Sequence, residues 1–241
     1  MTDTRRTAAS GAPPPAVAAR RWRPARGPAP GLPGALRRRT AWAAGLLAAV
    51  LLCGSLAVQP FVVVSGSMEN TLRTGDRVLV NKLAYRFGDV PARGDVVVFD
   101  GTGTFTAEGP RPGALTRMLR TTAAAAGLAE PPGNDYVKRV IGTGGDRVTC
   151  CDPRGRIEVN GEPLTERYLR PGDQASSVPF DVVVPDGRLW VMGDHRSGSS
   201  DSRDHLGRPG GGTVPVERVI GRVDAVGWPP TRWTAVHGGH G

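Results

Sequence analysis

The most constraining feature of this 241-residue chain is an uncharged apolar run near its N-terminus. No charged residue lies between Arg39 and Glu69, and Ala41–Val58 holds 18 uncharged, mainly apolar residues. A helix of that length, rising about 1.5 Å per residue, spans roughly 27 Å, which is close to the hydrocarbon thickness of a bilayer. Pro60 then interrupts the run. We therefore expect one transmembrane helix within residues 41–60.

Two other interpretations of this run stay open. A cleaved signal peptide would share its basic start, its apolar centre and its small residues, such as Ser55 and Ala57. A buried helix of a soluble protein fits less well, because the run has no polar face. The length of the run, and of the forty residues before it, favours an uncleaved anchor.

The basic charge of the chain lies almost entirely in its first forty residues. A formal net charge of +9 would suggest nucleic-acid binding. However, residues 1–40 hold nine arginines and one acid, so this segment carries +8 and the remainder only +1. The segment is rich in Ala, Pro and Gly, and we expect a disordered tail. Because positive charge stays on the cytoplasmic side, we expect residues 61–241 outside the plasma membrane and no nucleic-acid partner.

Residues 61–241 have the pattern of an antiparallel β domain. Short runs rich in Val and Ile alternate with turns containing Gly, Asp and Pro. Asn160-Gly161 has the composition of a type I′ hairpin turn. We expect a mainly β fold in which residues 103–134 form a small insertion, with a short helix in Ala114–Leu128. The expected strands are Phe61–Val64, Arg77–Asn81, Asp95–Phe99, Tyr136–Ile141, Asp146–Cys150, Arg156–Val159, Phe180–Val184, Leu189–Met192 and Val219–Val226.

Ser67 is a candidate nucleophile, because the segment around it ends an apolar strand abruptly. An ordinary Ser/Gly turn explains the same residues equally well. A serine nucleophile needs a base, and His195 or His205 would give a Ser-His-Asp hydrolase. The other possibility is a lysine that burial has made neutral.

The chain offers only two lysines for that role, Lys82 and Lys138. Strand alternation places Lys138 on one face with Tyr136 and Val140, which is an apolar setting. Lys82 shares a face with apolar residues in the same way, so periodicity does not choose between them. Either lysine could also be an ordinary surface residue.

A third segment, Gly193–Gly207, is dense in hydroxyl groups and opposite charges directly after an apolar strand. It could be a polar surface loop, but its carboxylates do not converge on one point, so we expect no metal site. Cys150 and Cys151 could form a vicinal disulfide or be two small buried residues. Cys53 falls in the apolar run.

The chain resembles the bacterial type I signal peptidases of peptidase family S26, in their actinobacterial form. These are membrane-anchored serine peptidases of the Ser–Lys type. Four segments carry the resemblance, in family order behind the N-terminal anchor. They read SGSMENTL, GDRVLVNKLAYRFG with RGDVVVF, DYVKRVIGTGGDRV and GDHRSGSSDSRDHLG.

The resemblance implies that Ser67 is the nucleophile and Lys138 the general base, while Lys82 is not catalytic. Ser65 would contribute its hydroxyl to the oxyanion hole, beside the backbone N–H of Ser67. Met68 would line the substrate cleft.

Further roles are implied for the last segment. Ser199 would hydrogen-bond the lysine head group, Asp201 and Arg203 would support the site as a charged pair, and Asp194 would lie nearby. His195 stands where asparagine is usual in the family, which argues against a histidine base.

The implied activity is removal of signal peptides from secretory preproteins through an acyl-enzyme, with no metal or cofactor. Cleavage sites would carry small residues at positions −1 and −3, and the catalytic domain would also touch lipid. Two alternatives remain: a secreted Ser-His-Asp hydrolase, and a non-catalytic, membrane-anchored β domain that binds partners.

Overall fold

The computed structural model describes residues 39, 41–46, 57–106, 113–125 and 134–236. The chain divides into two compact units, residues 1–46 and 47–241. In the first unit, residues 41–46 are helical and exposed. The expected tail and most of the expected anchor lie outside the described residues, as does Cys53. Within the described ranges, no helix is long and apolar enough to cross a membrane.

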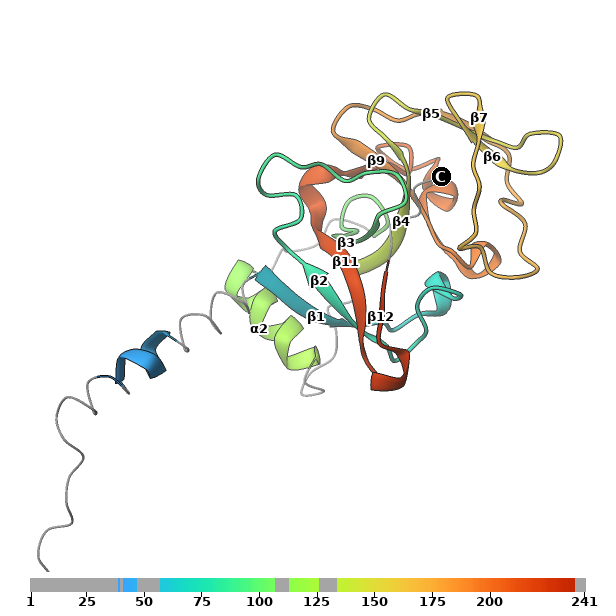
Figure 1. Ribbon diagram of the computed structural model, residues 1–241. Helices are drawn as coiled ribbons and strands as arrows, with labels where there is room; N and C mark the ends of the chain where they lie inside the picture. Colours follow the sequence, from blue (N-terminus) through green and yellow to red (C-terminus); the bar gives the residue numbers. More distant parts are fainter. Residues whose placement is uncertain (1–38, 40, 47–56, 107–112, 126–133, 237–241) are drawn as a thin grey trace, which may run out of the picture. The chain divides into compact units, whose positions relative to one another are not determined.

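The described part of the second unit is mainly antiparallel β structure, as the sequence predicts (Figure 1). The larger sheet has the strand order β1-β2-β11-β3-β4-β9-β10, and β12 pairs with β11. Its strands are β1 (Val58–Val62), β2 (Arg77–Asn81), β3 (Val96–Asp100), β4 (Asp135–Thr143), β9 (Arg188–Met192), β10 (Val214–Pro215), β11 (Val219–Trp228) and β12 (Thr234–Ala235).

A smaller sheet has the order β7-β6-β5-β8. Its strands are β5 (Arg147–Cys150), β6 (Ile157–Val159), β7 (Glu162–Pro163) and β8 (Phe180–Val183). The turn between β6 and β7 is the predicted hairpin, because Asn160 and Gly161 have φ angles of 56° and 82°. Two successive positive φ angles match the right-handed twist of the strands on either side.

Short helices connect the strands of the described residues. The α-helix α2 (Ala114–Ala125) falls within the expected helix of the insertion and lies beside β1 in Figure 1. The flanking residues 107–112 and 126–133 lie outside the described ranges. The one-turn 3-10 helices are η1 (Gly66–Met68), η2 (Arg196–Gly198), η3 (Ser202–His205), η4 (Val216–Arg218) and η5 (Pro230–Arg232).

β1 begins earlier than predicted, at Val58 rather than Phe61. Residues 58–60, which we assigned to the end of the apolar anchor, pair with β2 instead. Pro60 lacks the N–H that an inner strand would need, but β1 lies at the edge of the sheet, where one side needs no partner.

Buried apolar side chains form a core shared by both sheets. Trp190 of β9 and Ile141 of β4 come from the larger sheet, and Val148 and Ile157 from the smaller one. All four are at most 1% exposed. Cys150 and Cys151, at the end of β5, are joined by a disulfide.

We predict that Trp190→Ala lowers the free energy of unfolding by about 3–5 kcal/mol, because it leaves a large cavity in this core. Trp233→Ala is the matched control, since Trp233 is 69% exposed, and it should cost less than about 1 kcal/mol. Urea unfolding of the purified chain measures both. Equal losses in the two variants would contradict the described packing.

Candidate active site

Ser67 lies in η1, at the end of the segment that leaves β1. The backbone there is fixed by two hydrogen bonds, from Val63 N to the Asp76 carbonyl and from Gly75 N to the Val63 carbonyl, both 2.8 Å long. Ser67 itself is only 6% exposed. The sequence therefore presents a serine on a tight, immobilised turn rather than on an open loop.

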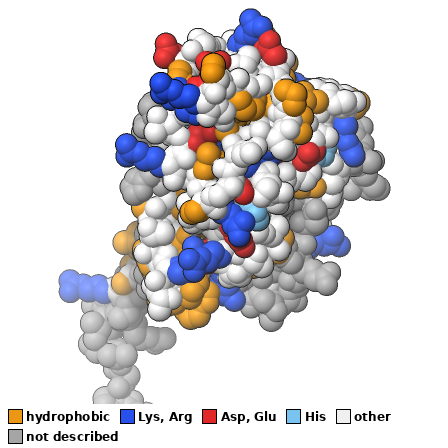
Figure 2. Space-filling model, turned by 90° about the vertical axis from the view of Figure 1, so that its right-hand side faces the viewer, with side chains coloured by type: hydrophobic (Ala, Val, Ile, Leu, Met, Phe, Trp, Pro, Cys, Tyr) orange, Lys and Arg blue, Asp and Glu red, His pale blue; other side chains and the backbone are white. Residues whose placement is uncertain are grey.

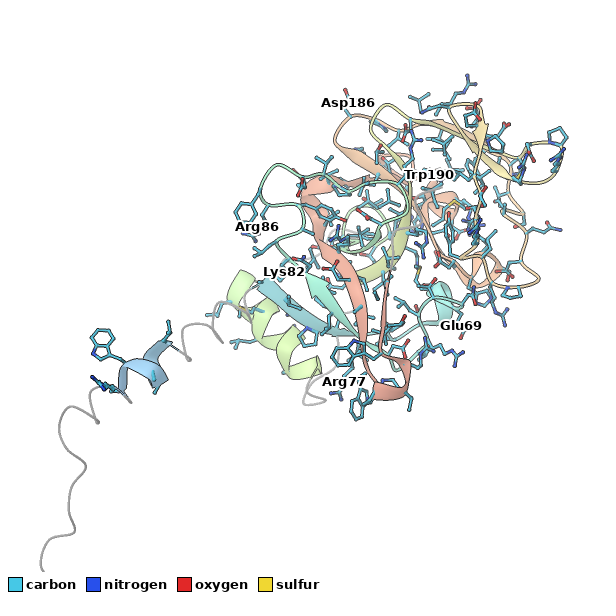
Figure 3. The ribbon with its side chains drawn as sticks, viewed as in Figure 1. Glu69, Arg77, Lys82, Arg86, Asp186 and Trp190 are labelled. Atoms are coloured by element: carbon cyan, nitrogen blue, oxygen red, sulfur yellow. A yellow bond between two sulfur atoms is a disulfide. The ribbon has the colours of Figure 1, made fainter. Side chains whose placement is uncertain are left out.

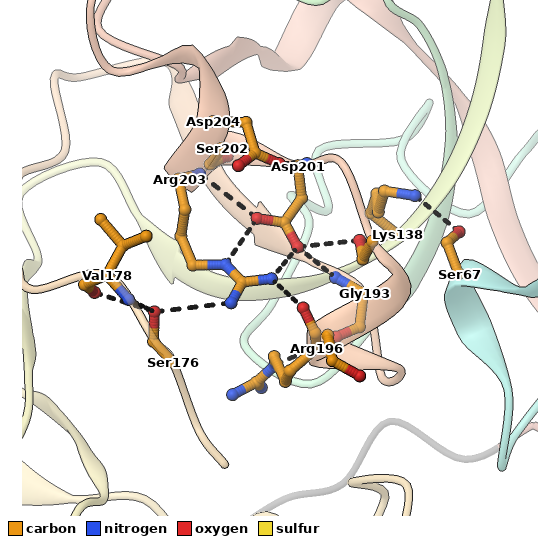
Figure 4. Close-up of polar contacts among 12 residues, drawn as sticks. Ser67, Lys138, Ser176, Val178, Gly193, Arg196, Asp201, Ser202, Arg203 and Asp204 are labelled. Atoms are coloured by element: carbon orange, nitrogen blue, oxygen red, sulfur yellow. Dashed lines mark hydrogen bonds and ion pairs between the residues drawn. The ribbon is translucent and has the colours of Figure 1, made fainter. Parts of the chain in front are cut away.

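Lys138 reaches Ser67 from the middle of β4. Its Nζ donates to Ser67 Oγ over 2.7 Å, and its side chain is 3% exposed (Figure 4). In the sheet, Lys138 stands opposite Val97 of β3. Burial disfavours the ammonium form and lowers the pKa of Lys138 to about 8, although the negative charges of Asp201 and Asp194 act in the opposite direction.

Lys82 occupies a different part of the molecule. It follows β2 directly, and Figure 3 shows it far across the unit from Glu69, which lies two residues after Ser67. The structure thus brings together Ser67 and Lys138, and not Ser67 and Lys82. Periodicity in the sequence could not make this distinction.

Neither candidate histidine binds the Ser67 hydroxyl. The ring of His205 stacks on Phe105, with ring centres 4.4 Å apart, and its Nδ1 lies 2.7 Å from the Asp201 carbonyl. The ring of His195 contacts the carbonyl of Gly66 at 3.2 Å. This arrangement does not favour a Ser-His-Asp site.

Asp201 organises the loop that follows β9. Its carboxylate accepts hydrogen bonds from the backbone N–H of Gly193, from the Ser199 hydroxyl and from the Arg203 guanidinium, at 2.8–3.0 Å (Figure 4). Burial raises the pKa of Asp201, but these hydrogen bonds and the charge of Arg203 outweigh it and lower the pKa. The Ser199 hydroxyl thus donates its hydrogen bond to Asp201, which leaves its oxygen lone pairs as the acceptor for the expected contact with the lysine head group.

Asp194 binds the opposite face of the Lys138 strand. It accepts two hydrogen bonds from the guanidinium of Arg139, at 2.8 and 2.7 Å, and one from the Thr71 hydroxyl. The Arg139 guanidinium also lies 4.0 Å above the Tyr168 ring. Because Arg139 and Asp194 are 2% and 0% exposed, this is a buried, bidentate ion pair.

Ser65 and Met68 lie on either side of Ser67 in the sequence, but Ser65 is at the surface and Met68 is buried. Ser65 is exposed, and its Oγ lies 3.3 Å from Ser67 Oγ. Met68 is 1% exposed and packs in the core with Phe61 and Leu72. Its side chain thus lies beneath the turn that holds Ser67.

Sequence reasoning did not assign a role to Gly193 or Arg139. A Cβ on Gly193 would overlap both the Ser67 carbonyl and the Ser199 side chain, so only glycine allows this approach. A glycine directly after an apolar strand is a signal for such an approach. Arg139 gave no comparable signal, since its partner is 55 residues away.

The exposed surface at this end of the unit is mixed in character. Figure 2 shows acidic, basic and histidine side chains close together near the middle of this face, among polar atoms and scattered hydrophobic side chains. Across the residues that the structure describes, no three His, Cys, Asp or Glu side chains are grouped to hold a metal ion.

Comparison with known proteins identifies the family. The family model described as signal peptidase, peptidase S26, matches residues 37–228. A probable signal peptidase I of Mycobacterium leprae is 37% identical over 234 residues, covering 83% of this chain and 80% of that protein. A signal peptidase I of Mycobacterium tuberculosis is 39% identical over 204 residues, covering 76% and 69%.

Among solved structures, a signal peptidase I from Enterococcus faecalis matches with a TM-score of 0.36 and 21% identity. That match covers 56% of this chain and 97% of the other. The family model and the mycobacterial relatives decide the assignment: the chain belongs to the signal peptidase family, peptidase S26.

Proposed function

We infer that this protein is a signal peptidase I, a serine endopeptidase that removes signal peptides from secretory preproteins. The observation that supports this function most strongly is the buried hydrogen bond between Lys138 Nζ and Ser67 Oγ, 2.7 Å long, in a chain of the S26 family. A serine peptidase needs a base within hydrogen-bond reach of its nucleophile, and Lys138 meets that condition.

In the proposed mechanism, neutral Lys138 accepts the proton of Ser67 as the serine oxygen attacks the scissile carbonyl. The resulting ammonium then protonates the leaving amine, and an acyl-enzyme forms. Lys138 next takes a proton from water as the water oxygen attacks the ester carbonyl. The ester bond then breaks, the lysine ammonium returns the proton to the Ser67 oxygen, and the signal peptide leaves with a free carboxyl end. Serine, lysine, substrate and water account for every atom, so the proposed reaction uses no metal or cofactor.

The proposed oxyanion hole consists of the backbone N–H of Ser67 and the hydroxyl of Ser65. One donor of this kind contributes about 3–4 kcal/mol to transition-state stabilisation. The exposure of Ser65 and its 3.3 Å distance from Ser67 Oγ support the assignment, because its hydroxyl can turn toward a bound substrate.

Asp201, Arg203 and Ser199 are proposed as supporting residues. They immobilise the loop that approaches Ser67 through Gly193, and the nearby negative charge of Asp201 raises the pKa of Lys138 against the effect of burial. Asp194 has an equivalent role through Arg139, the neighbour of Lys138. Met68 is proposed to form the floor of the cleft, directly after the nucleophile.

We further propose a membrane arrangement with the anchor ending before β1. Residues 1–40 form a cytoplasmic tail, a single-pass anchor in the plasma membrane lies within residues 41–57, and the extracytoplasmic catalytic domain begins with β1 at Val58 and includes 103–134 as an insertion. Preproteins with small residues at −1 and −3 would reach the site where they leave the bilayer, and the domain would touch lipid there.

We predict that Ser67→Ala and Lys138→Ala each lower kcat for a model preprotein on the order of 10⁴-fold or more, as in other serine peptidases that lose the nucleophile or the base. Lys82→Ala is the matched control and should retain full activity. Gel analysis of precursor and product at fixed times measures all three. Full activity in Lys138→Ala would refute the dyad.

We also predict that kcat/KM increases with pH. Lys138 acts as a base only when neutral, and its pKa is lowered to about 8, so kcat/KM should rise as the pH increases through 8. Below that value, kcat/KM should fall about tenfold per pH unit. A rate that stays constant between pH 6 and pH 9 would contradict the assignment of Lys138 as the base.

A further inference from the structure

His195 contacts the nucleophile turn at two successive carbonyl groups. Its backbone N–H donates to the Ser67 carbonyl over 3.1 Å, and its ring Nδ1 lies 3.2 Å from the Gly66 carbonyl. The mechanism above assigns no role to this residue. Its side chain is 18% exposed, so the contact is largely shielded from water.

The groups around the imidazole ring fix its tautomer. Arg170 Nη1 lies 3.1 Å from Nε2, and a guanidinium can only donate. The Gly66 carbonyl on the other side can only accept. In this geometry Nε2 accepts from Arg170, and Nδ1 carries the hydrogen that it donates to the Gly66 carbonyl, with Glu69 Oε2 3.9 Å from Nδ1.

Both the ring and its arginine partner are held in place. A Cβ on Gly198 would lie 2.5 Å from His195 Cε1, so the glycine backbone packs directly against the ring. The backbone N–H of Arg170 donates to the Asp194 carbonyl over 3.1 Å. Glu69 Oε2 lies 3.7 Å from Arg170 Nε and balances its charge.

The Gly66 carbonyl belongs to the same peptide unit as the backbone N–H of Ser67. In a planar trans peptide, the C=O and the following N–H point in opposite directions. The Gly66 carbonyl accepts one hydrogen bond from the backbone N–H of Glu69, over 3.0 Å. The second hydrogen bond, from the His195 ring, adds to the first in fixing this carbonyl and therefore the direction of the Ser67 N–H. It also polarises the peptide, which makes that N–H a stronger donor.

We propose that His195 is a positioning residue, whose Nδ1–H bond to the Gly66 carbonyl aims the Ser67 N–H at the oxyanion. The inference rests on the proposed function, because it assigns a purpose to that N–H. The oxyanion exists only in the transition state and the tetrahedral intermediate. Loss of this hydrogen bond should therefore lower kcat and leave KM unchanged.

Three variants separate the hydrogen bond from simple packing. His195→Ala should lower kcat on the order of 10- to 100-fold with KM nearly unchanged, a smaller loss than deletion of an oxyanion donor itself. His195→Asn should keep kcat within about threefold of wild type, because the amide nitrogen of asparagine can occupy the position of Nδ1. His195→Gln should resemble alanine, because its amide extends toward the position of Nε2.

A peptide aldehyde gives an independent measurement. It adds to a serine hydroxyl and forms a tetrahedral adduct with an oxyanion, whereas the corresponding peptide alcohol cannot. His195→Ala should weaken inhibition by the aldehyde by the same factor as kcat and leave inhibition by the alcohol unchanged. Urea unfolding checks that the variants remain folded, and Arg147→Ala is the control substitution, because the Arg147 side chain on the smaller sheet is exposed.

Two results would overturn the inference: an unchanged kcat in His195→Ala, or equal losses in the Asn, Gln and Ala variants. A loss confined to KM would also contradict it. An inactive wild-type chain would instead refute the proposed function, so the two failures can be told apart.

Discussion

The hydrogen bond between Lys138 and Ser67 is the interaction on which the rest of the site depends. An ammonium group loses its hydration when it is buried, so its neutral form becomes accessible near pH 8 rather than near the ordinary value for lysine. The larger sheet supplies that burial, because Lys138 lies on β4 between two neighbouring strands. The turn after β1 brings Ser67, the proposed nucleophile, to the same point. Strand order and catalytic chemistry are thus linked through one side chain.

Two buried aspartates, Asp201 and Asp194, connect the segments that surround Ser67 and Lys138. Asp201 binds Arg203 and the Gly193 backbone, and Asp194 binds Arg139 next to the base. Buried ion pairs contribute little net stability, since the cost of desolvation offsets their attraction, but they fix geometry strongly. The two carboxylates also limit how far burial lowers the pKa of Lys138. In the proposed mechanism, the same two carboxylates thus influence both the position of Lys138 and its protonation.

Local patterns in the sequence predicted the fold well and the site only in part. The antiparallel strands and the Asn160-Gly161 hairpin follow from alternation and turn chemistry, which act over a few residues. The predicted start of the first strand at Phe61 was wrong, because residues 58–60 pair with β2 although their apolar pattern also fits a helix. Alternation could not separate Lys138 from Lys82, and the choice came from the family resemblance. The contacts of Arg139 and His195 could not be predicted from local patterns, because their partners lie far away in the sequence.

Lys138 is a buried amine whose lowered pKa makes its neutral form accessible at moderate pH, and titration of its amino group measures this directly. The chain has only two lysines, so NMR spectra of lysine-labelled protein contain two side-chain signals, and Lys82→Arg identifies the one from Lys138. We expect a titration midpoint near pH 8 for Lys138. A midpoint at the ordinary lysine value of about 10.4 would contradict it.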